Sequence, residues 1–295
     1  MKKDLQESKL FTPYQMGPVT LRNRVIRSAA FESMGKDFAP TQDLKDYHVS
    51  VARGGVGMTT LAYASINRSG VSFNSQLWLR DEIVPQLRDI TDAVHAEGAA
   101  VGIQIGHCGN MTHWSTAGSF PVSASNGFNL YSPTFHRRMT HEDIAQTAKD
   151  FGKAVYTAHE AGFDSVEVHA GHGYLISQFL SPWTNRRRDE FGGSLENRMR
   201  FMKMCLTEVM EAAAKCNMAV LVKHNMEDGF KSGIQIPESI EIAKEIEKFG
   251  VHGIVLSSGF VSRAPMAVMR GRIPTKTMGY YMGWNEWLQK IVVSL

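Results

Sequence analysis

Residues 166–182 combine a short apolar run with a turn that holds two histidines, two glycines and a tyrosine. Alternation along a strand puts Glu167 and His169 on one face and the valines beside them on the other. His169 therefore ends the strand on the polar face, with His172 and Tyr174 just beyond it. Imidazole and phenol groups donate and accept hydrogen bonds, and so polar a turn after a buried strand usually holds a ligand.

Two other strand-like segments add polar groups to the same rim. In residues 101–105 the aliphatic side chains share one face and Gln104 lies on the other, and in residues 220–223 Lys223 falls opposite the two valines. Each residue alone could be an ordinary buried polar side chain. Burying four such groups together without a ligand would leave many donors unpaired.

Two ligand classes compete for this rim. A metal hydrolase would use His169 and His172, together with His107, His224 or Glu167. An ammonium close to a divalent cation is repulsive, however, and the inward set holds a lysine and a single carboxylate. A flat heterocycle fits better, because Gln104 can both donate and accept on one edge while Lys223 favours negative charge there.

Short β-branched runs alternate with longer amphipathic stretches along the chain. The sequence predicts strands over residues 25–28, 56–61, 99–105, 165–169, 219–224 and 253–257. It predicts helices over residues 41–52, 85–97, 140–161, 194–216 and 237–249, most of them stopped by glycine. Thr140 and Asp143 stand at capping-box spacing.

This alternation predicts a parallel sheet, either a β/α barrel or a doubly wound sheet. The barrel is favoured, because no GxGxxG follows the first strand and the polar groups recur at the carboxyl ends of several strands. Residues 106–139 read as a long, helix-poor functional loop on the same rim. Only six of the eight strands of a closed barrel are visible before the chain stops at residues 291–295.

Composition narrows the class of protein. The chain has 295 residues, 32 basic and 29 acidic side chains, and basic residues that are scattered except for Arg186-Arg187-Arg188, so no nucleic-acid partner is expected. That arginine run reads as a solvated or structural segment. Three cysteines without a CxxC pair favour a reducing compartment, and no apolar run is long enough to span a membrane. The cytoplasm is the expected location.

The chain resembles the Old Yellow Enzyme family of flavin-dependent ene-reductases, especially its NADH:flavin oxidoreductase and dienoyl-CoA-reductase-like branch. The resemblance runs from about Leu10 to Arg272. The motifs that carry it are Leu21-Arg22-Asn23-Arg24, Gln104-Ile105-Gly106-His107-Cys108-Gly109, His169-Ala170-Gly171-His172-Gly173-Tyr174-Leu175 and Gly192-Gly193-Ser194-Leu195-Glu196-Asn197-Arg198.

The resemblance implies a parallel β/α barrel of the FMN-linked oxidoreductase type, with about six of its eight strands in this chain and FMN at the carboxyl rim. His169 and His172 match the pair that grips the carbonyl oxygen of the substrate, and Tyr174 matches the proton donor; no metal is implied. The implied cofactor-binding residues are Ser28, Ala29, Ala30, Phe31, Ala62, Tyr63, Gln104 and Lys223.

The implied activity passes hydride from NADH or NADPH through flavin N5 to the C=C bond of an α,β-unsaturated carbonyl compound. The partners would then be a nicotinamide donor and a small enone or enoyl substrate. Two departures stand out: Lys223 replaces the usual arginine and loses its two-pronged geometry, and Phe31 replaces a smaller polar or thiol residue.

The family's seventh and eighth strands, which supply the FMN phosphate loops, are not found in the sequence. We therefore expect residues 1–295 to be a single FMN-binding β/α barrel domain that is incomplete at its C-terminus. The alternative is a catalytically impaired barrel fragment or subunit with weak or no FMN binding. Open sheet edges would favour a homo-oligomer or a completing segment.

Overall fold

The computed structural model describes residues 8–269. Its centre is a parallel sheet with the spatial order β12-β11-β10-β6-β4-β3, and the short β5 also pairs with β4. The six predicted strands are all present, with shifts of at most four residues at their ends. The strands are β3 (Ile26–Arg27), β4 (Met58–Ser65), β5 (Leu77–Trp78), β6 (Ala100–Gly106), β10 (Ser165–Ala170), β11 (Ala219–Asn225) and β12 (Gly253–Ser257).

The five predicted long helices are also present. They are α1 (Gln42–Arg53), α2 (Val84–Ala96), α4 (His141–Glu160), α6 (Leu195–Cys216) and α7 (Ile236–Glu247). The capping box forms as expected: Asp143 N–H donates to Thr140 Oγ1 at 3.1 Å, and Thr140 N–H donates back to the Asp143 carboxylate at 2.7 Å. Short helices α5 (Leu175–Leu180) and α8 (Pro265–Met269) follow β10 and β12.

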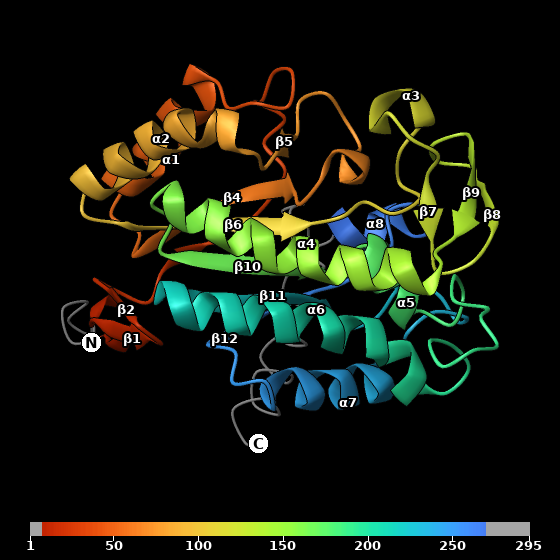
Figure 1. Ribbon diagram of the computed structural model, residues 1–295. Helices are drawn as coiled ribbons and strands as arrows, with labels where there is room; N and C mark the ends of the chain where they lie inside the picture. The colour runs from red at the N-terminus through yellow and green to blue at the C-terminus, as the bar shows by residue number, and fades with distance from the viewer. Residues whose placement is uncertain (1–7, 270–295) are drawn as a thin grey trace.

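The order of the main strands in space is the same as their order along the chain. A doubly wound sheet reverses its strand order and places helices on both faces. Here the long helices follow the curving sheet as one arc, from α1 and α2 through α4 and α6 to α7 (Figure 1). The arrangement is therefore an arc of a β/α barrel, and the predicted fold class is confirmed.

The apolar core lies between this helical arc and the sheet. Strand residues such as Ile103, Val166 and Val220 are fully buried in one cluster with Phe151 of α4 and Phe201 of α6. The polar residues that alternate with them must face the inside of the arc. The alternation read from the sequence is thus realised in the sheet.

A small hairpin covers the amino-terminal end of the strands. Strands β1 (Tyr14–Met16) and β2 (Val19–Leu21) pair antiparallel, and Met16 and Leu21 pack on Met58 and Ala219, the first residues of β4 and β11. The turn requires glycine, since Gly17 has φ +56° and a Cβ there would lie 2.1 Å from the His252 ring. This leaves the opposite, carboxyl end for the candidate site.

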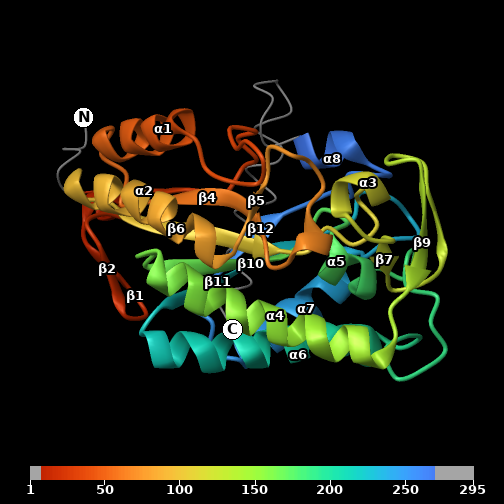
Figure 2. The same ribbon diagram turned by 45° about the horizontal axis from the view of Figure 1, so that its top comes forward.

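The stretch from 106 to 139, predicted as a long, helix-poor loop, is indeed poor in helix but carries a small sheet. It contains the short helix α3 (Trp114–Ala117) and a separate sheet of β7 (Val122–Ser123), β9 (Thr134–Arg138) and β8 (Gly127–Asn129), in that order. Strands this short carry too few alternating residues to be recognised in the sequence. The small sheet lies beside α5, at the carboxyl end of the main strands (Figures 1 and 2).

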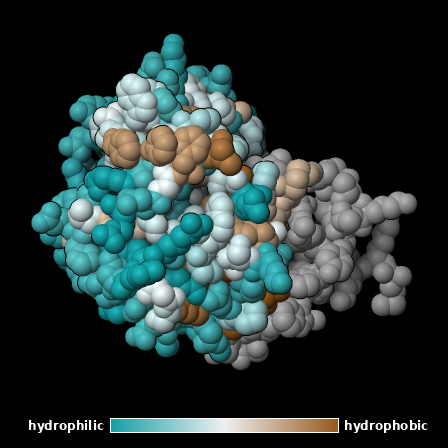
Figure 3. All heavy atoms as spheres, turned by 90° about the vertical axis from the view of Figure 1, so that its right-hand side faces the viewer, coloured by the Kyte–Doolittle hydropathy of each residue, from teal (hydrophilic) through white to brown (hydrophobic). Residues whose placement is uncertain are grey.

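The small sheet exposes several large apolar side chains. Phe128, Leu130, Tyr131 and Phe135 are all exposed, and the rings of Phe128 and Phe135 pack edge to face 4.9 Å apart. The face of the molecule on this side shows a row of apolar residues above a largely polar surface (Figure 3).

Strands β3 and β12 form the two outer edges of the main sheet within residues 8–269. Remaining short 3-10 turns are Lys9–Phe11, Arg68–Gly70 and Asp81–Ile83. None of the described helices is both long enough and apolar enough to cross a bilayer. The end of the resemblance at Arg272 and the closing run 291–295 lie outside the described residues.

Candidate active site

The turn between β10 and α5 is held in one shape by its neighbours. His172 and Gly173 both have positive φ, +60° and +82°. The backbone N–H of His172 donates to Asn225 Oδ1 at the end of β11, at 3.1 Å. A Cβ on Gly173 would lie 2.4 Å from the Phe260 ring, so only glycine fits there. The chain reverses tightly enough here to keep His169, His172 and Tyr174 at one place.

The three predicted catalytic side chains do come together. The rings of His169 and His172 have centroids 4.9 Å apart, and those of His169 and Tyr174 are 4.8 Å apart. Tyr63 of β4 stacks on Tyr174 with centroids 4.9 Å apart and planes inclined by 26°. Two imidazoles and two phenols therefore share the carboxyl end of the sheet.

Burial sets the protonation states in this cluster. Burial lowers the pKa of His169 well below its usual value, and His172 and Lys223 lower it further. Burial also raises the pKa of the Tyr174 phenol. At neutral pH His169 is thus a neutral imidazole and Tyr174 a protonated phenol, and both can donate hydrogen bonds. Within residues 8–269, the buried His169 Nδ1 has no hydrogen-bond partner.

The two histidines are not equivalent. His172 Nε2 lies 2.5 Å from Ser257 Oγ at the end of β12, which fixes the orientation of the His172 ring. The sequence resemblance implied a pair that acts together on one oxygen. In the structure the His172 ring is anchored to a neighbouring strand through Nε2, whereas His169 keeps the orphaned ring nitrogen.

Gln104, Glu167 and Lys223 form one buried polar cluster across three adjacent strands. Glu167 lies directly opposite Gln104 on β6, and His169 lies opposite Lys223 on β11. Glu167 Oε1 accepts from Gln104 Nε2 at 2.6 Å and lies 3.1 Å from Lys223 Nζ. The inward orientation of Gln104 and Lys223 is as predicted, but Lys223 is already paired with a carboxylate.

Lys223 also holds the segment that follows β3. Its Nζ donates to the Ala29 carbonyl oxygen at 2.7 Å, and Arg27 Nη2 donates to the Ala30 carbonyl oxygen at 3.0 Å. Phe31 is 38% exposed and stacks on Phe73, with ring centroids 5.7 Å apart. The implied flavin-facing segment Ser28 to Phe31 is therefore tied to β11 and leads out to the surface.

Glu32 connects this segment to β4. Its carboxylate pairs with Arg27 Nη1 at 2.5 Å, lies 3.3 Å from His48 Nε2, and accepts from the Ala62 backbone N–H at 3.3 Å. Burial opposes ionisation of Glu32, but His48 and Arg27 together lower its pKa. The two implied cofactor-facing segments, 28–31 and 62–63, thus share one ionic anchor.

An irregularity in β4 turns the end of this buried strand toward the site. The pairing of β4 with β6 shifts between Leu61 and Ala64, so Ala62 and Tyr63 leave the regular ladder. Tyr63 has φ +31°, and its hydroxyl donates to the Gly70 carbonyl oxygen at 2.7 Å. A bulge of this kind re-aims a side chain, and here it places the Tyr63 ring against Tyr174.

The two additional histidines of the metal hypothesis, His107 and His224, have hydrogen-bond partners of their own. His107 Nδ1 accepts from the Gly109 backbone N–H at 3.0 Å, and His224 Nε2 lies 2.9 Å from Ser239 Oγ. Burial lowers the pKa of both imidazoles to about 4.

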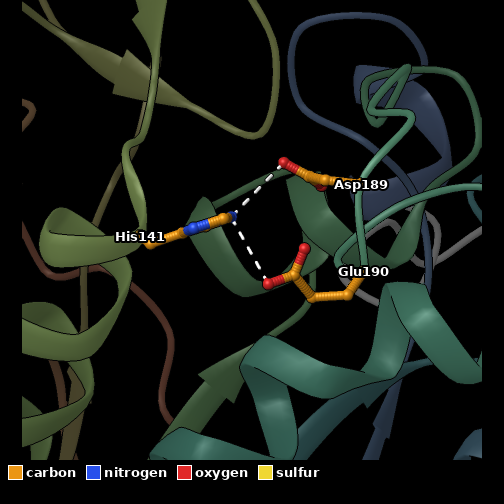
Figure 4. A group of neighbouring side chains, drawn as sticks. All are labelled: His141, Asp189 and Glu190. Atoms are coloured by element: carbon orange, nitrogen blue, oxygen red, sulfur yellow. Dashed lines mark ion pairs between the residues drawn. The ribbon is translucent and has the colours of Figure 1, made fainter.

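A different set is the one group of three residues within 8–269 whose geometry could hold a metal ion: His141, Asp189 and Glu190 (Figure 4). His141 Nε2 lies 3.6 Å from Asp189 Oδ2 and 3.5 Å from Glu190 Oε1. Asp189 already accepts two hydrogen bonds from Arg187, at 2.8 and 2.6 Å. The guanidinium compensates this carboxylate and would repel a cation, so the group does not make a metal centre.

Glu32, Glu167 and Ser257 hold other residues of the site in place, and the sequence did not predict this role for any of them. Strand parity placed Glu167 inward, but only as a ligand in the metal reading. Glu32 follows a short strand and gives no periodic signal. Ser257 was predicted at the end of its strand, but its contact with His172 joins segments 85 positions apart and leaves no local pattern.

Comparison with known proteins identifies relatives over most of the chain. A family model described as the NADH:flavin oxidoreductase / NADH oxidase family matches residues 9–280. The 4,4'-dithiodibutanoate disulfide reductase of Rhodococcus erythropolis is 35% identical over 266 residues, which cover 90% of this chain and 66% of that protein. The NADPH dehydrogenase of Listeria welshimeri is 35% identical over 272 residues, which cover 90% of this chain and 78% of that protein.

Solved structures show the same architecture. A 2-naphthoyl-CoA reductase in complex with 2-naphthoyl-CoA superposes with a TM-score of 0.85 at 26% identity, over 94% of this chain and 44% of that one. An Old Yellow Enzyme homologue from Zymomonas mobilis shares the fold, with a TM-score of 0.78 at 24% identity over 90% of this chain and 79% of that one. The chain thus spans just under two thirds of the disulfide reductase and less than half of the naphthoyl-CoA reductase.

Proposed function

Because the chain belongs to the NADH:flavin oxidoreductase / NADH oxidase family, we propose that it reduces the C=C bond of an α,β-unsaturated carbonyl compound with hydride from NADH or NADPH. Membership of this family confirms the resemblance to the Old Yellow Enzyme family. It also identifies FMN as the cofactor and a nicotinamide nucleotide as the hydride donor. One observation supports an enone as the substrate: the neutral His169, whose Nδ1 has no partner among the described residues, lies beside the protonated Tyr174.

The residues of the rim fit FMN. The Gln104 amide and the Lys223 ammonium would hold the polar edge of the ring. Backbone of Ser28, Ala29, Ala30 and Phe31, and of Ala62 and Tyr63, would line it. FMN, when bound, supplies the hydride chemistry between the nicotinamide and the substrate. The protein holds these groups in advance through the Glu167 and Glu32 contacts, so little reorganisation is needed on binding.

The histidines and the tyrosine act on the substrate. Hydrogen bonds from His169 and His172 to the carbonyl oxygen would draw electron density from the conjugated double bond and make its β-carbon electrophilic. Tyr174 would then give its phenolic proton to the α-carbon. Because His169 is buried and His172 and Tyr174 are partly buried, these hydrogen bonds are shielded from much of the bulk water, which strengthens them.

The direct test combines His169→Ala with His172→Ala. We expect the double variant to bind phenols weakly and to reduce enones slowly, while bleaching of the yellow flavin by NADPH persists. A phenol gives a ligand readout that is independent of turnover, by its effect on the flavin absorbance. Unchanged enone turnover would show that the two histidines do not activate the substrate.

The second candidate is a barrel fragment or subunit with weak or no FMN binding. The observation behind it is the edge position of β12, whose residues are all partly exposed in the described part of the chain. Purified protein that is yellow and bleaches with NADPH supports the enzyme. Colourless, self-associating protein supports the fragment.

The assignment of residues 1–295 to a single FMN-binding domain, and a cytoplasmic location, belong to the same proposal. Cys108, Cys205 and Cys216 are all free thiols, which is typical of a reducing compartment.

A further inference from the structure

The three successive arginines 186–188 have three different environments. Arg187 is buried and donates to the Ala124 and Met139 carbonyl oxygens, at 3.1 and 2.8 Å, in addition to its pair with Asp189. Arg188 is exposed on the surface. Arg186 is also exposed, but it lines a cavity. The run is therefore not uniformly structural, and Arg186 needs an explanation of its own.

This cavity has a volume of about 220 Å³ and lies between the small sheet and the loops that follow α5 and β12. Its walls include Phe128, Asn129, His136, Trp183, Arg186 and Arg263. The described lining residues include no Asp or Glu. Burial lowers the pKa of His136, so the positive charge of the cavity comes from the two arginines.

Both guanidinium groups contact Trp183, Arg186 at its main chain and Arg263 at its indole ring. Arg186 Nε donates to the Trp183 carbonyl oxygen at 3.3 Å, and the Arg263 guanidinium carbon lies 6.0 Å from the centre of the Trp183 ring. Neither arginine forms a salt bridge with any carboxylate in residues 8–269. Two guanidinium groups that line one cavity without acidic partners favour phosphate, and an indole ring favours a flat base.

Residues that line the cavity are next in sequence to residues that pack in the candidate active site. Val261, next to the lining residue Ser262, packs on the Tyr63 cluster, and its N–H donates to the His172 carbonyl oxygen at 3.0 Å. On the other wall, the lining residue Asn110 is followed by Met111 of the same cluster. A ligand whose reactive end lies at His169 could therefore extend its other end toward the arginines.

We propose that Arg186 and Arg263, together with Trp183 in the same cavity, bind the phosphate-bearing nucleotide end of a ligand whose reactive group lies at the His169 cluster. This inference rests on the proposed function and extends it. Two ligands share the required chemistry: the nicotinamide hydride donor and an enoyl thioester of coenzyme A. Both combine a pyrophosphate with an adenine nucleotide at the end remote from the reacting atoms.

Calorimetric titration of the purified chain tests the site without catalysis. The probes are coenzyme A, 2',5'-ADP and inorganic pyrophosphate, at low ionic strength. We expect at least one nucleotide to bind, and Arg186→Ala and Arg263→Ala each to raise its Kd by about tenfold or more. Binding of coenzyme A would identify the ligand as an enoyl thioester of coenzyme A. Binding of 2',5'-ADP would identify it as NADPH.

The matched control is Arg188→Ala, which removes the same charge two positions further along the chain and outside the cavity. Its Kd should stay within about twofold of wild type. Unchanged affinity in the Arg186→Ala, Arg263→Ala double variant would overturn the proposal, and so would binding of pyrophosphate without either nucleotide. Reduction of a small neutral enone by the unsubstituted chain reports on the proposed function separately, because nucleotide binding is measured without turnover.

Discussion

The Glu167 carboxylate lies 3.1 Å from the Lys223 ammonium, and both side chains are almost completely buried. The pair joins β10 to β11, and Glu167 also accepts from Gln104 on β6. The charge proposed to act on the flavin edge is thus held by a counter-charge inside the protein. Lys223 is oriented before any ligand binds.

Replacing Glu167 with Gln should destabilise the fold. The substitution leaves the Lys223 ammonium buried without a counter-charge, which costs roughly 3–5 kcal/mol of unfolding free energy. Urea unfolding measures the loss. Adding Lys223→Met to Glu167→Gln should restore much of the stability, because the uncompensated charge is then gone.

The matched control is Lys45→Met, which breaks the more exposed pair between Lys45 and Asp89, 2.7 Å apart. Its cost should be about 0–1 kcal/mol. Equal losses for Glu167→Gln and Lys45→Met would show that the buried pair has no special weight.

Replacing Tyr174 with Phe should slow enone reduction and leave the fold intact. The ring that stacks on Tyr63 remains, while the proton proposed for the α-carbon is lost. We expect kcat to fall by roughly 10²–10⁴-fold, with little change in the binding of phenols. Steady-state kinetics measures this, and Tyr156→Phe on the exposed face of α4 is the control. An unaltered kcat would assign the proton to another donor.

Two buried histidines should make the fold sensitive to acid. Burial lowers the pKa of His107 and His224 to about 4, whereas the unfolded chain takes up these protons near pH 6.5. The stability they contribute is complete above pH 6.5 and is lost as the pH falls toward 4. Each should contribute roughly 3 kcal/mol to the loss.

Urea unfolding at about pH 7 and about pH 4.5 measures this loss. His224→Gln should remove its own share of the pH dependence, whatever its effect at neutral pH. Other titrating groups are the same in both chains and cancel in the comparison. Identical pH dependence in the variant and the wild type would contradict the assignment.

Alanine substitutions at Gly173 and Gly193 should distinguish the cost of backbone strain from the cost of a steric clash. Gly173 and Gly193 have nearly the same φ, +82° and +81°, but a Cβ would meet the Phe260 ring only at Gly173. Gly193→Ala should therefore cost about 1 kcal/mol from φ alone, and Gly173→Ala should cost more. Unfolding free energies test this, and equal costs would show that Phe260 moves aside freely.

Much of the fold follows from local patterns. The six strands, the five long helices and the Thr140 capping box were predicted correctly, because hydrophobic period and capping chemistry depend on residues a few positions apart. The small sheet over residues 122–138 was missed, since its strands hold only two to five residues. Pairing with each other, rather than their own sequence, makes them strands.

The sequence alone determined which polar side chains face the inside of the arc and which turn carries His169, His172 and Tyr174. These follow from the two-residue period of a strand and from the glycines of the turn. Only the tertiary structure decided what each group meets: Lys223 with Glu167 and with the Ala29 carbonyl, 194 positions away, and His172 with Ser257, 85 positions away. Such contacts depend on the packing of whole strands against one another, and no local pattern of residues encodes them.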